Sequence, residues 1–152
     1  MKNQKFKRFE TKKKMPFSLK LIFIWMVFIV IRGLAKLTNL GRLEENYLLL
    51  GKPMAITNYV IDSIVLVAFV ILICLFILKN KNFWKYFVGI IVFMITGVLV
   101  GFIYLPGTIS LFPSEAQSFA LISTIIMQIL LLLFYTLLIF IVYRKRGYFQ
   151  HG

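Results

Sequence analysis

Long uninterrupted stretches of hydrophobic residues dominate the pattern of this chain. Four of them run over residues 17–37, 54–78, 83–105 and 119–143, and each approaches the ~20 residues that an α-helix needs to cross ~30 Å of hydrocarbon. The stretches lack the alternation of apolar and polar residues that marks the strands of a membrane β-barrel. The pattern therefore predicts an all-α, polytopic membrane protein, folded as an antiparallel bundle of four transmembrane helices.

Short polar segments separate the hydrophobic stretches. The predicted organisation is a transmembrane domain over residues 17–143, with a basic tail at 1–16 and a second basic tail at 144–152. The composition agrees, because 61% of the 152 residues are hydrophobic, against ~45–50% in ordinary soluble domains. A soluble core of this size cannot cover so much apolar surface, so the lipid bilayer is the expected partner of the outer helix faces.

The positive charges flank the hydrophobic stretches. Of the 18 Lys and Arg residues, eight lie in the first 20 residues, three at 79–85 and three at 144–146. With four spans these 14 residues share one side of the membrane, whereas the loops on the other side hold Arg42 and Lys52. Because cytoplasmic segments carry the excess of Lys and Arg, we expect a cell-membrane protein with both termini in the cytoplasm. We expect the basic tails to bind anionic lipid headgroups rather than nucleic acid.

The first hydrophobic stretch has an alternative interpretation as a cleaved signal peptide. Its apolar core at 21–31 has the length of a signal h-region, and Gly33 and Ala35 are small residues at the positions that a cleavage site needs. The long basic leader, and Arg32 directly beside the apolar core, favour a retained helix. Cleavage would leave three spans with the same C-terminal side.

Two charged residues inside the predicted spans carry the main hypothesis about a site. At 1.5 Å per residue, Arg32 lies ~22 Å along the first helix from Phe17, and Asp62 lies ~12 Å along the second from Met54. The two helices are consecutive and antiparallel, so these depths nearly match. A charge at mid-membrane costs ~2.5–3.5 kcal/mol on insertion scales. We therefore expect Arg32 and Asp62 to form an ion pair that is shielded from lipid.

Three uncharged polar residues are expected near the same depth. Asn58 lies one turn above Asp62, and Thr124 and Gln128 lie one turn apart in the fourth helix. Together with the ion pair they predict a polar patch in the outer half of the bundle. Two explanations stay open: hydrogen bonds that hold helices together, at ~0.6 kcal/mol each, or a ligand or ion site that opens outward.

Glycines in the third helix predict close helix packing. Gly97 and Gly101 are four residues apart, and Gly89 lies eight residues before Gly97 on nearly the same face. Small residues at this spacing allow two helix backbones to approach closely. The expected neighbour is the second or fourth helix, and a homodimer face is the alternative.

The residue types give little support to catalysis, a metal or a cofactor. Asp62 is the only aspartate, which excludes the paired-aspartate chemistry of membrane proteases. His151 is the only histidine and Cys74 the only cysteine, so no zinc, haem or disulfide site is expected within one chain. We expect a non-enzymatic accessory, assembly or immunity-type protein that contacts a second copy or another membrane protein. The alternative is a small oligomeric transporter or channel with a polar site at Arg32, Asp62 and Gln128.

Overall fold

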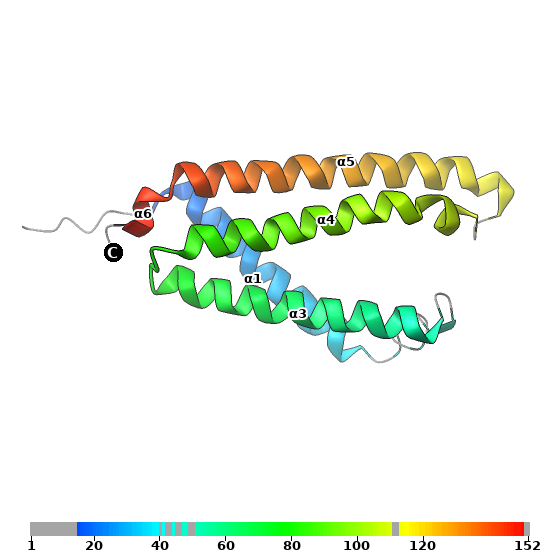
Figure 1. Ribbon diagram of the computed structural model, residues 1–152, viewed down its shortest axis with the longest axis horizontal. Coiled ribbons are helices and arrows are strands. Elements are labelled where there is room, and N and C mark those ends of the chain that lie inside the picture. Colours follow the sequence, from blue (N-terminus) through cyan, green and yellow to red (C-terminus); the bar gives the residue numbers. More distant parts are fainter. Residues whose placement is uncertain are drawn as a thin grey trace, which may run out of the picture.

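Four long helices and one short helix are the elements with bounds in the part of the chain that the structure describes. The computed structural model describes residues 15–39, 41, 44, 47–48, 51–110 and 113–150. The helices in these residues are α1 (Phe17–Thr38), α3 (Lys52–Ile77), α4 (Phe83–Ile109), α5 (Ser114–Arg144) and α6 (Gly147–Gln150) (Figure 1). The predicted basic tail at 1–16 lies outside the described residues except for Met15 and Pro16.

The four long helices are each long and apolar enough to cross a membrane. This confirms the predicted all-α fold with four transmembrane spans. Two helices extend further than their predicted spans. The C-terminal end of α4 continues to Ile109, and the N-terminal end of α5 begins at Ser114. Polar residues lower the hydropathy of these segments without breaking the helix.

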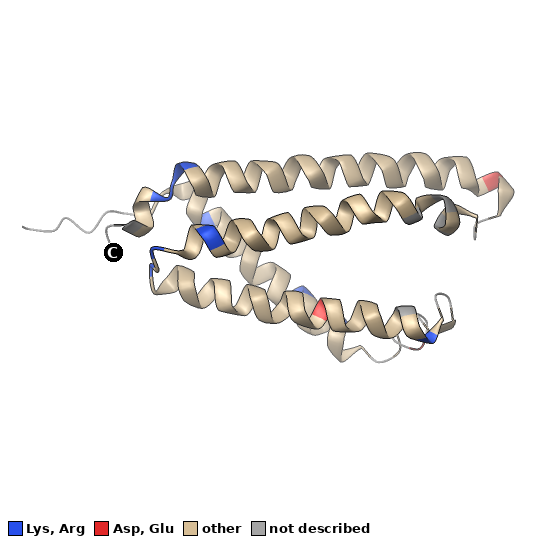
Figure 2. Cartoon of the chain, in the orientation of Figure 1, with Lys and Arg blue, Asp and Glu red and all other residues tan. Residues whose placement is uncertain are grey.

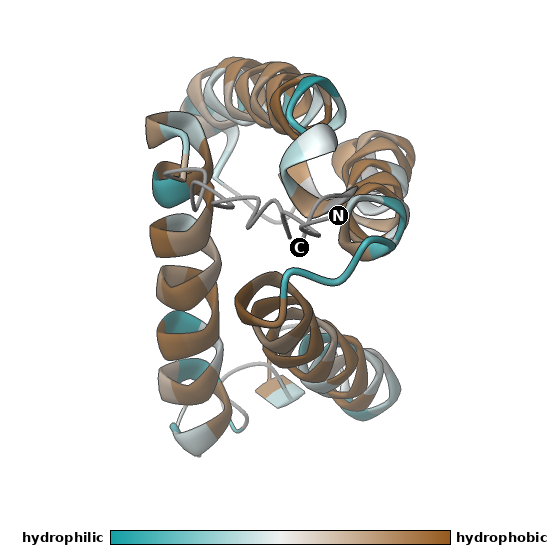
Figure 3. Cartoon of the chain, turned by 90° about the vertical axis from the view of Figure 1, so that its left-hand side faces the viewer, coloured by the Kyte–Doolittle hydropathy of each residue, from teal (hydrophilic) through white to brown (hydrophobic). Residues whose placement is uncertain are grey.

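The long helices form an antiparallel bundle in chain order. α1 packs against α3, α3 against α4, α4 against α5, and α5 back against α1. α1 runs obliquely across the bundle, from beside the end of α5 to beside α3 (Figures 1 and 3). The most extensive contacts join α1 to α3 and α4 to α5. The bundle therefore consists of two helix pairs.

Charged residues mark the two ends of the bundle (Figure 2). The turn between α3 and α4, with Lys79 and Lys81, lies beside the end of α5 at Arg144; we call this the basic end. Lys52 and Glu115 lie at the other end, which we call the opposite end. The two corresponding halves of the bundle differ in packing.

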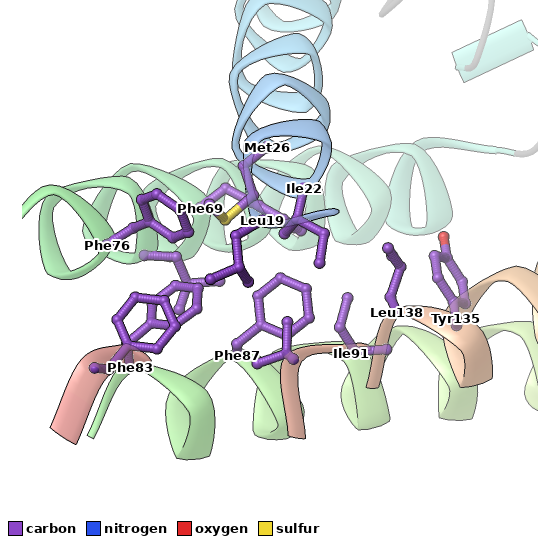
Figure 4. Close-up of a cluster of buried hydrophobic side chains, with 13 residues drawn as sticks. Leu19, Ile22, Met26, Phe69, Phe76, Phe83, Phe87, Ile91, Tyr135 and Leu138 are labelled. Atoms are coloured by element: carbon purple, nitrogen blue, oxygen red, sulfur yellow. The ribbon is translucent and has the colours of Figure 1, made fainter. Parts of the chain in front are cut away.

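The core lies in the basic half. Thirteen buried side chains from all five helices form one cluster: Leu19, Ile22, Met26, Phe69, Leu72, Phe76, Phe83, Phe87, Ile91, Tyr135, Leu138, Val142 and Phe149 (Figure 4). The rings of Phe83 and Phe149 lie 4.7 Å apart, so α6 closes the core at the basic end. Part of the predicted tail at 144–152 is thus packed helix. In the opposite half, the buried residues among the described side chains are Ala55, Leu105 and Ile109.

The outward faces of the helices are apolar. Phe17, Ile103 and Phe119 expose 74–78% of their surface. Figure 3, seen from the basic end, shows long helices that are mostly hydrophobic around the outside. Such a surface suits a protein dissolved in lipid, because lipid tails are as apolar as the side chains and do not drive them inward.

Candidate functional site

α1 and α3 approach each other closely in the opposite half. A Cβ atom at Gly33 would lie 3.1 Å from Cδ1 of Leu66, so a glycine at this position allows the contact. One turn further along α1, the Tyr59 hydroxyl donates a hydrogen bond to the Leu37 carbonyl at 3.3 Å. These two contacts set the register of the helix pair.

Asp62 forms an ion pair with Lys36, between Oδ2 and Nζ. This corrects the predicted pairing, in which the partner was Arg32. The reason is the register: Leu66 faces Gly33, so Arg32 lies at the level of Leu66, and the residue that reaches Asp62 comes one turn later on α1. The side chains of Lys36 and Asp62 are 42% and 33% exposed, so the pair is open rather than sealed between helices.

The ion pair and Arg32 line one groove of about 240 Å³ between the two helix pairs. Its other wall comes from Met94 of α4 and Tyr135 of α5. The Tyr135 hydroxyl points away from α5 and toward α3 (Figure 4). The lining residues are Ile29, Arg32, Gly33, Lys36, Asp62, Val65, Leu66, Met94 and Tyr135. The groove thus has a charged side on α1 and α3 and a largely apolar remainder.

Arg32 carries the uncompensated charge of this groove. Lys36 and Asp62 neutralise each other, and no described carboxylate lies within ion-pair distance of Arg32. The Arg32 side chain is exposed. A guanidinium stays charged at every relevant pH and presents a planar fork of donors that matches a carboxylate or a phosphate. The groove can therefore bind an oxyanion through Arg32.

The other predicted polar residues do not join the groove. Asn58 is exposed on α3, and the Thr124 hydroxyl donates to the Ala120 carbonyl of its own helix at 2.7 Å. The side chain of Gln128 extends from α5 toward α4, where its Nε2 lies 3.1 Å from the position that a Cβ at Gly101 would take. Its Oε1 is buried without a hydrogen-bond partner in the described part of the chain. The predicted single patch therefore divides among separate places, because α3 and α5 are diagonal in the bundle.

The three glycines of α4 also lie in different surroundings. Gly101 packs against Gln128 of α5, which is the fourth long helix and one of the two neighbours that the sequence allowed. A Cβ at Gly89 or Gly97 would meet nothing within 4 Å, and both positions are exposed. The packing face predicted for three glycines is thus limited, within this chain, to Gly101.

Of the nine lining residues, sequence reasoning predicted Arg32 and Asp62; among those that it missed, Gly33, Lys36 and Tyr135 give the groove its close helix contact and its further polar groups. Lys36 lies two residues before the end of α1, where a lysine is usually assigned to the membrane interface. The available signal was its spacing, since Lys36 is one turn from Arg32 on the same helix face. Tyr135 also left a signal, because its hydroxyl lies in the middle of an apolar stretch rather than at the membrane interface where tyrosines are enriched.

The described groove offers few groups for catalysis or metal binding. Asp62 is its one carboxylate, and that carboxylate is engaged by Lys36. Among the described residues, no three His, Cys, Asp or Glu side chains gather where they could hold a metal ion. The chemistry that the groove can provide is charge and hydrogen-bond donation from Arg32, Lys36 and Tyr135.

Fold and groove together define a multi-pass membrane protein with an open, charged groove between its two antiparallel helix pairs. Comparisons of this chain with protein-family models, with curated proteins and with solved structures found no match.

Proposed function

We propose that this protein is a non-enzymatic membrane protein that binds an oxyanion in the groove at Arg32. The observation that carries the proposal is the pairing of Asp62 with Lys36, which leaves Arg32 without a counter-charge among the described residues. An unpaired cation in a membrane span is costly unless a polar partner compensates it. A phosphate or carboxylate group would supply that partner.

The groove also indicates which kind of molecule carries the anion. Its walls are mostly apolar, with residues such as Ile29, Val65 and Met94 around the charged side. This combination suits an amphiphile, with the anionic group at Arg32 and an alkyl chain along the walls. A free phosphate ion shares the anionic chemistry but makes no use of the walls.

The packed core supports binding over conduction. Tyr135 belongs both to the groove and to the core, which fills the bundle from there to Phe149 at the basic end. An ion path along the bundle would have to open this cluster of aromatic and aliphatic side chains. We therefore favour a binding site that is reached from one side over the transporter or channel.

The proposal includes an orientation in the cell membrane. The basic end faces the cytoplasm, since it carries the excess of Lys and Arg. The groove then serves ligands in, or entering from, the outer leaflet. Arg32 lies ~22 Å from the start of α1, which places its guanidinium below the outer headgroups.

A fluorescence titration tests the proposal. A Trp84→Phe background leaves Trp25 as the only tryptophan, and its ring lies 5.7 Å from Phe134, the neighbour of Tyr135. The protein in uncharged detergent micelles is titrated with inorganic phosphate, with dodecyl phosphate and with zwitterionic dodecylphosphocholine. We expect a saturable signal with dodecyl phosphate and a weak one with dodecylphosphocholine. Saturation by inorganic phosphate alone would identify a free ion rather than an amphiphile as the ligand.

Matched variants assign the binding to Arg32. Arg32→Gln should weaken binding about tenfold or more, because hydrogen bonds to charged groups contribute ~1.5–3 kcal/mol and 1.4 kcal/mol is a factor of ten. Lys52→Gln removes one charge at the same end but outside the groove, and it should leave affinity almost unchanged. Equal effects of the two substitutions, or equal binding of dodecyl phosphate and dodecylphosphocholine, would overturn the proposal and favour a protein that acts through helix contacts.

A further inference from the structure

A second groove lies in the basic half, between α3 and α4. These helices are joined by a short turn, yet they contact each other less than α1 contacts α3 or α4 contacts α5. The groove has a volume of about 490 Å³, within the ~300–1,000 Å³ range of ligand sites. Its lining residues are Ala68, Ile71, Leu72, Leu75, Asn80, Asn82, Tyr86 and Ile90.

The polar lining of this groove is confined to one end. Asn80, Asn82 and Tyr86 lie in or next to the turn at the basic end, and the remaining lining is aliphatic. The turn is held in place, because the Asn82 backbone N–H donates to Oδ1 of Asn80 at 2.9 Å. The lining of the groove thus matches the two parts of a lipid molecule. Its polar residues lie at the membrane edge, and its apolar residues lie toward the membrane interior.

The charge around the polar end is positive. Lys81 lies between the groove residues Asn80 and Asn82, Lys85 directly precedes Tyr86, and both lysines are exposed. Lys79 lines a different pocket together with Tyr148, and its Nζ lies 5.4 Å from the Tyr148 ring. The Nζ of Lys85 lies 5.8 Å from the ring of the adjacent Trp84, and Lys85 stays exposed. The sequence contains no acidic residue from 63 to 114. Nothing in this segment therefore offsets the attraction of Lys81 and Lys85 for an anionic headgroup.

We propose that this groove binds one anionic phospholipid of the leaflet at the basic end. An acyl chain lies along Ala68, Leu72 and Ile90, and the phosphate lies at the turn, near Lys81 and Lys85. Basic pockets between transmembrane helices recognise anionic headgroups in this way. The site is independent of the groove at Arg32, which lies in the other half of the bundle.

The test measures bound lipid by native mass spectrometry. The full chain, purified in an uncharged detergent, is incubated with phosphatidylglycerol or with phosphatidylcholine. The experiment is repeated in the Arg32→Gln background, so that any lipid at the other groove is removed from the count. In that background we expect one phosphatidylglycerol to remain bound in preference to phosphatidylcholine.

Two pairs of variants identify the position of the lipid. Lys81→Gln/Lys85→Gln should abolish the preference for phosphatidylglycerol, whereas Arg144→Gln/Lys145→Gln removes as many charges from the same end and should preserve it. Ala68→Leu narrows the groove and should lower the retention of both lipids severalfold.

The control for Ala68→Leu is Val70→Leu, on the lipid-facing side of the same helix, where the side chain is 44% exposed. It should have no effect on retention. Equal losses from the two charge variants would mean a diffuse attraction to the basic end and would overturn the proposal. Unchanged retention in Ala68→Leu would overturn it as well, because the chain would then lie outside the groove.

Discussion

The two halves of this bundle differ in how tightly their helices pack and in the polarity of the side chains between them. In the basic half, aromatic rings from every described helix contact one another. The ring centroid of Phe76, for example, lies 5.2 Å from that of Phe83 and 5.5 Å from that of Phe149. In the opposite half, the helices associate mainly in pairs, and charged side chains line the space between the pairs. The basic half supplies the packed core of the bundle, and the opposite half contains an open groove lined by charged side chains.

The difference follows from the physics of packing in lipid. Burying an apolar side chain against another gains little over burying it in lipid, so close van der Waals contact must stabilise the helix contacts. Aromatic rings supply much contact area and preferred edge-to-face geometries, as between Trp25 and Phe69 at 79°. Because this cluster is confined to one half, the oblique α1 is anchored by Leu19, Ile22 and Met26 at its start. Over its whole length α1 contacts α3 more than α5, and its far end lies beside α3 (Figure 1).

The largest predicted effect tests whether the core of the basic half supplies the stability. Phe83→Ala removes a fully buried ring and should lower the free energy of unfolding by roughly 2 kcal/mol, through the cavity and the lost ring contacts rather than through transfer from water. Phe119→Ala removes the same group from a site that is 78% exposed and should change the free energy by less than ~0.5 kcal/mol. Unfolding in mixed micelles, followed by circular dichroism, measures both. Equal losses would refute the distinction between the halves.

A medium effect is expected at the glycines of α4. Gly101→Ala places a methyl group 3.1 Å from Nε2 of Gln128 and should lower the free energy of unfolding by ~1 kcal/mol. Gly97→Ala meets open space and should raise it by up to ~1 kcal/mol through reduced backbone freedom in the unfolded chain. The same unfolding assay applies. A destabilising Gly97→Ala would indicate that a second copy or a partner helix packs on this face.

The smallest effect distinguishes the two candidate partners of Asp62. A double-mutant cycle of Lys36→Gln and Asp62→Asn should give a coupling of ~0.5–1 kcal/mol, which is modest because both side chains are about a third or more exposed. The matched cycle of Arg32→Gln and Asp62→Asn should give a coupling near zero. The reverse order of the two couplings would restore the Arg32–Asp62 pair and remove the basis for an anion site at Arg32.

The sequence by itself determined the fold class and the number of spans. Hydropathy and length are local properties, and a helix satisfies its own backbone in lipid whatever its neighbours are. For this reason the predicted spans agree with α1, α3, α4 and α5 to within a few residues, apart from the longer ends of α4 and α5. The sequence also located the level at which a charge needs a partner, since Asp62 stands out in any apolar stretch.

Only the tertiary structure decided which residues meet at that level. The partner of Asp62 depends on the register of α1 against α3, which the Gly33–Leu66 contact sets and which counting residues along straight helices cannot reveal. The separation of Gln128 from Asp62 likewise depends on the order of helices around the bundle. The position of a span depends on the hydropathy of one segment, and hence on its preference for lipid over water. A site depends on how side chains from several segments pack together.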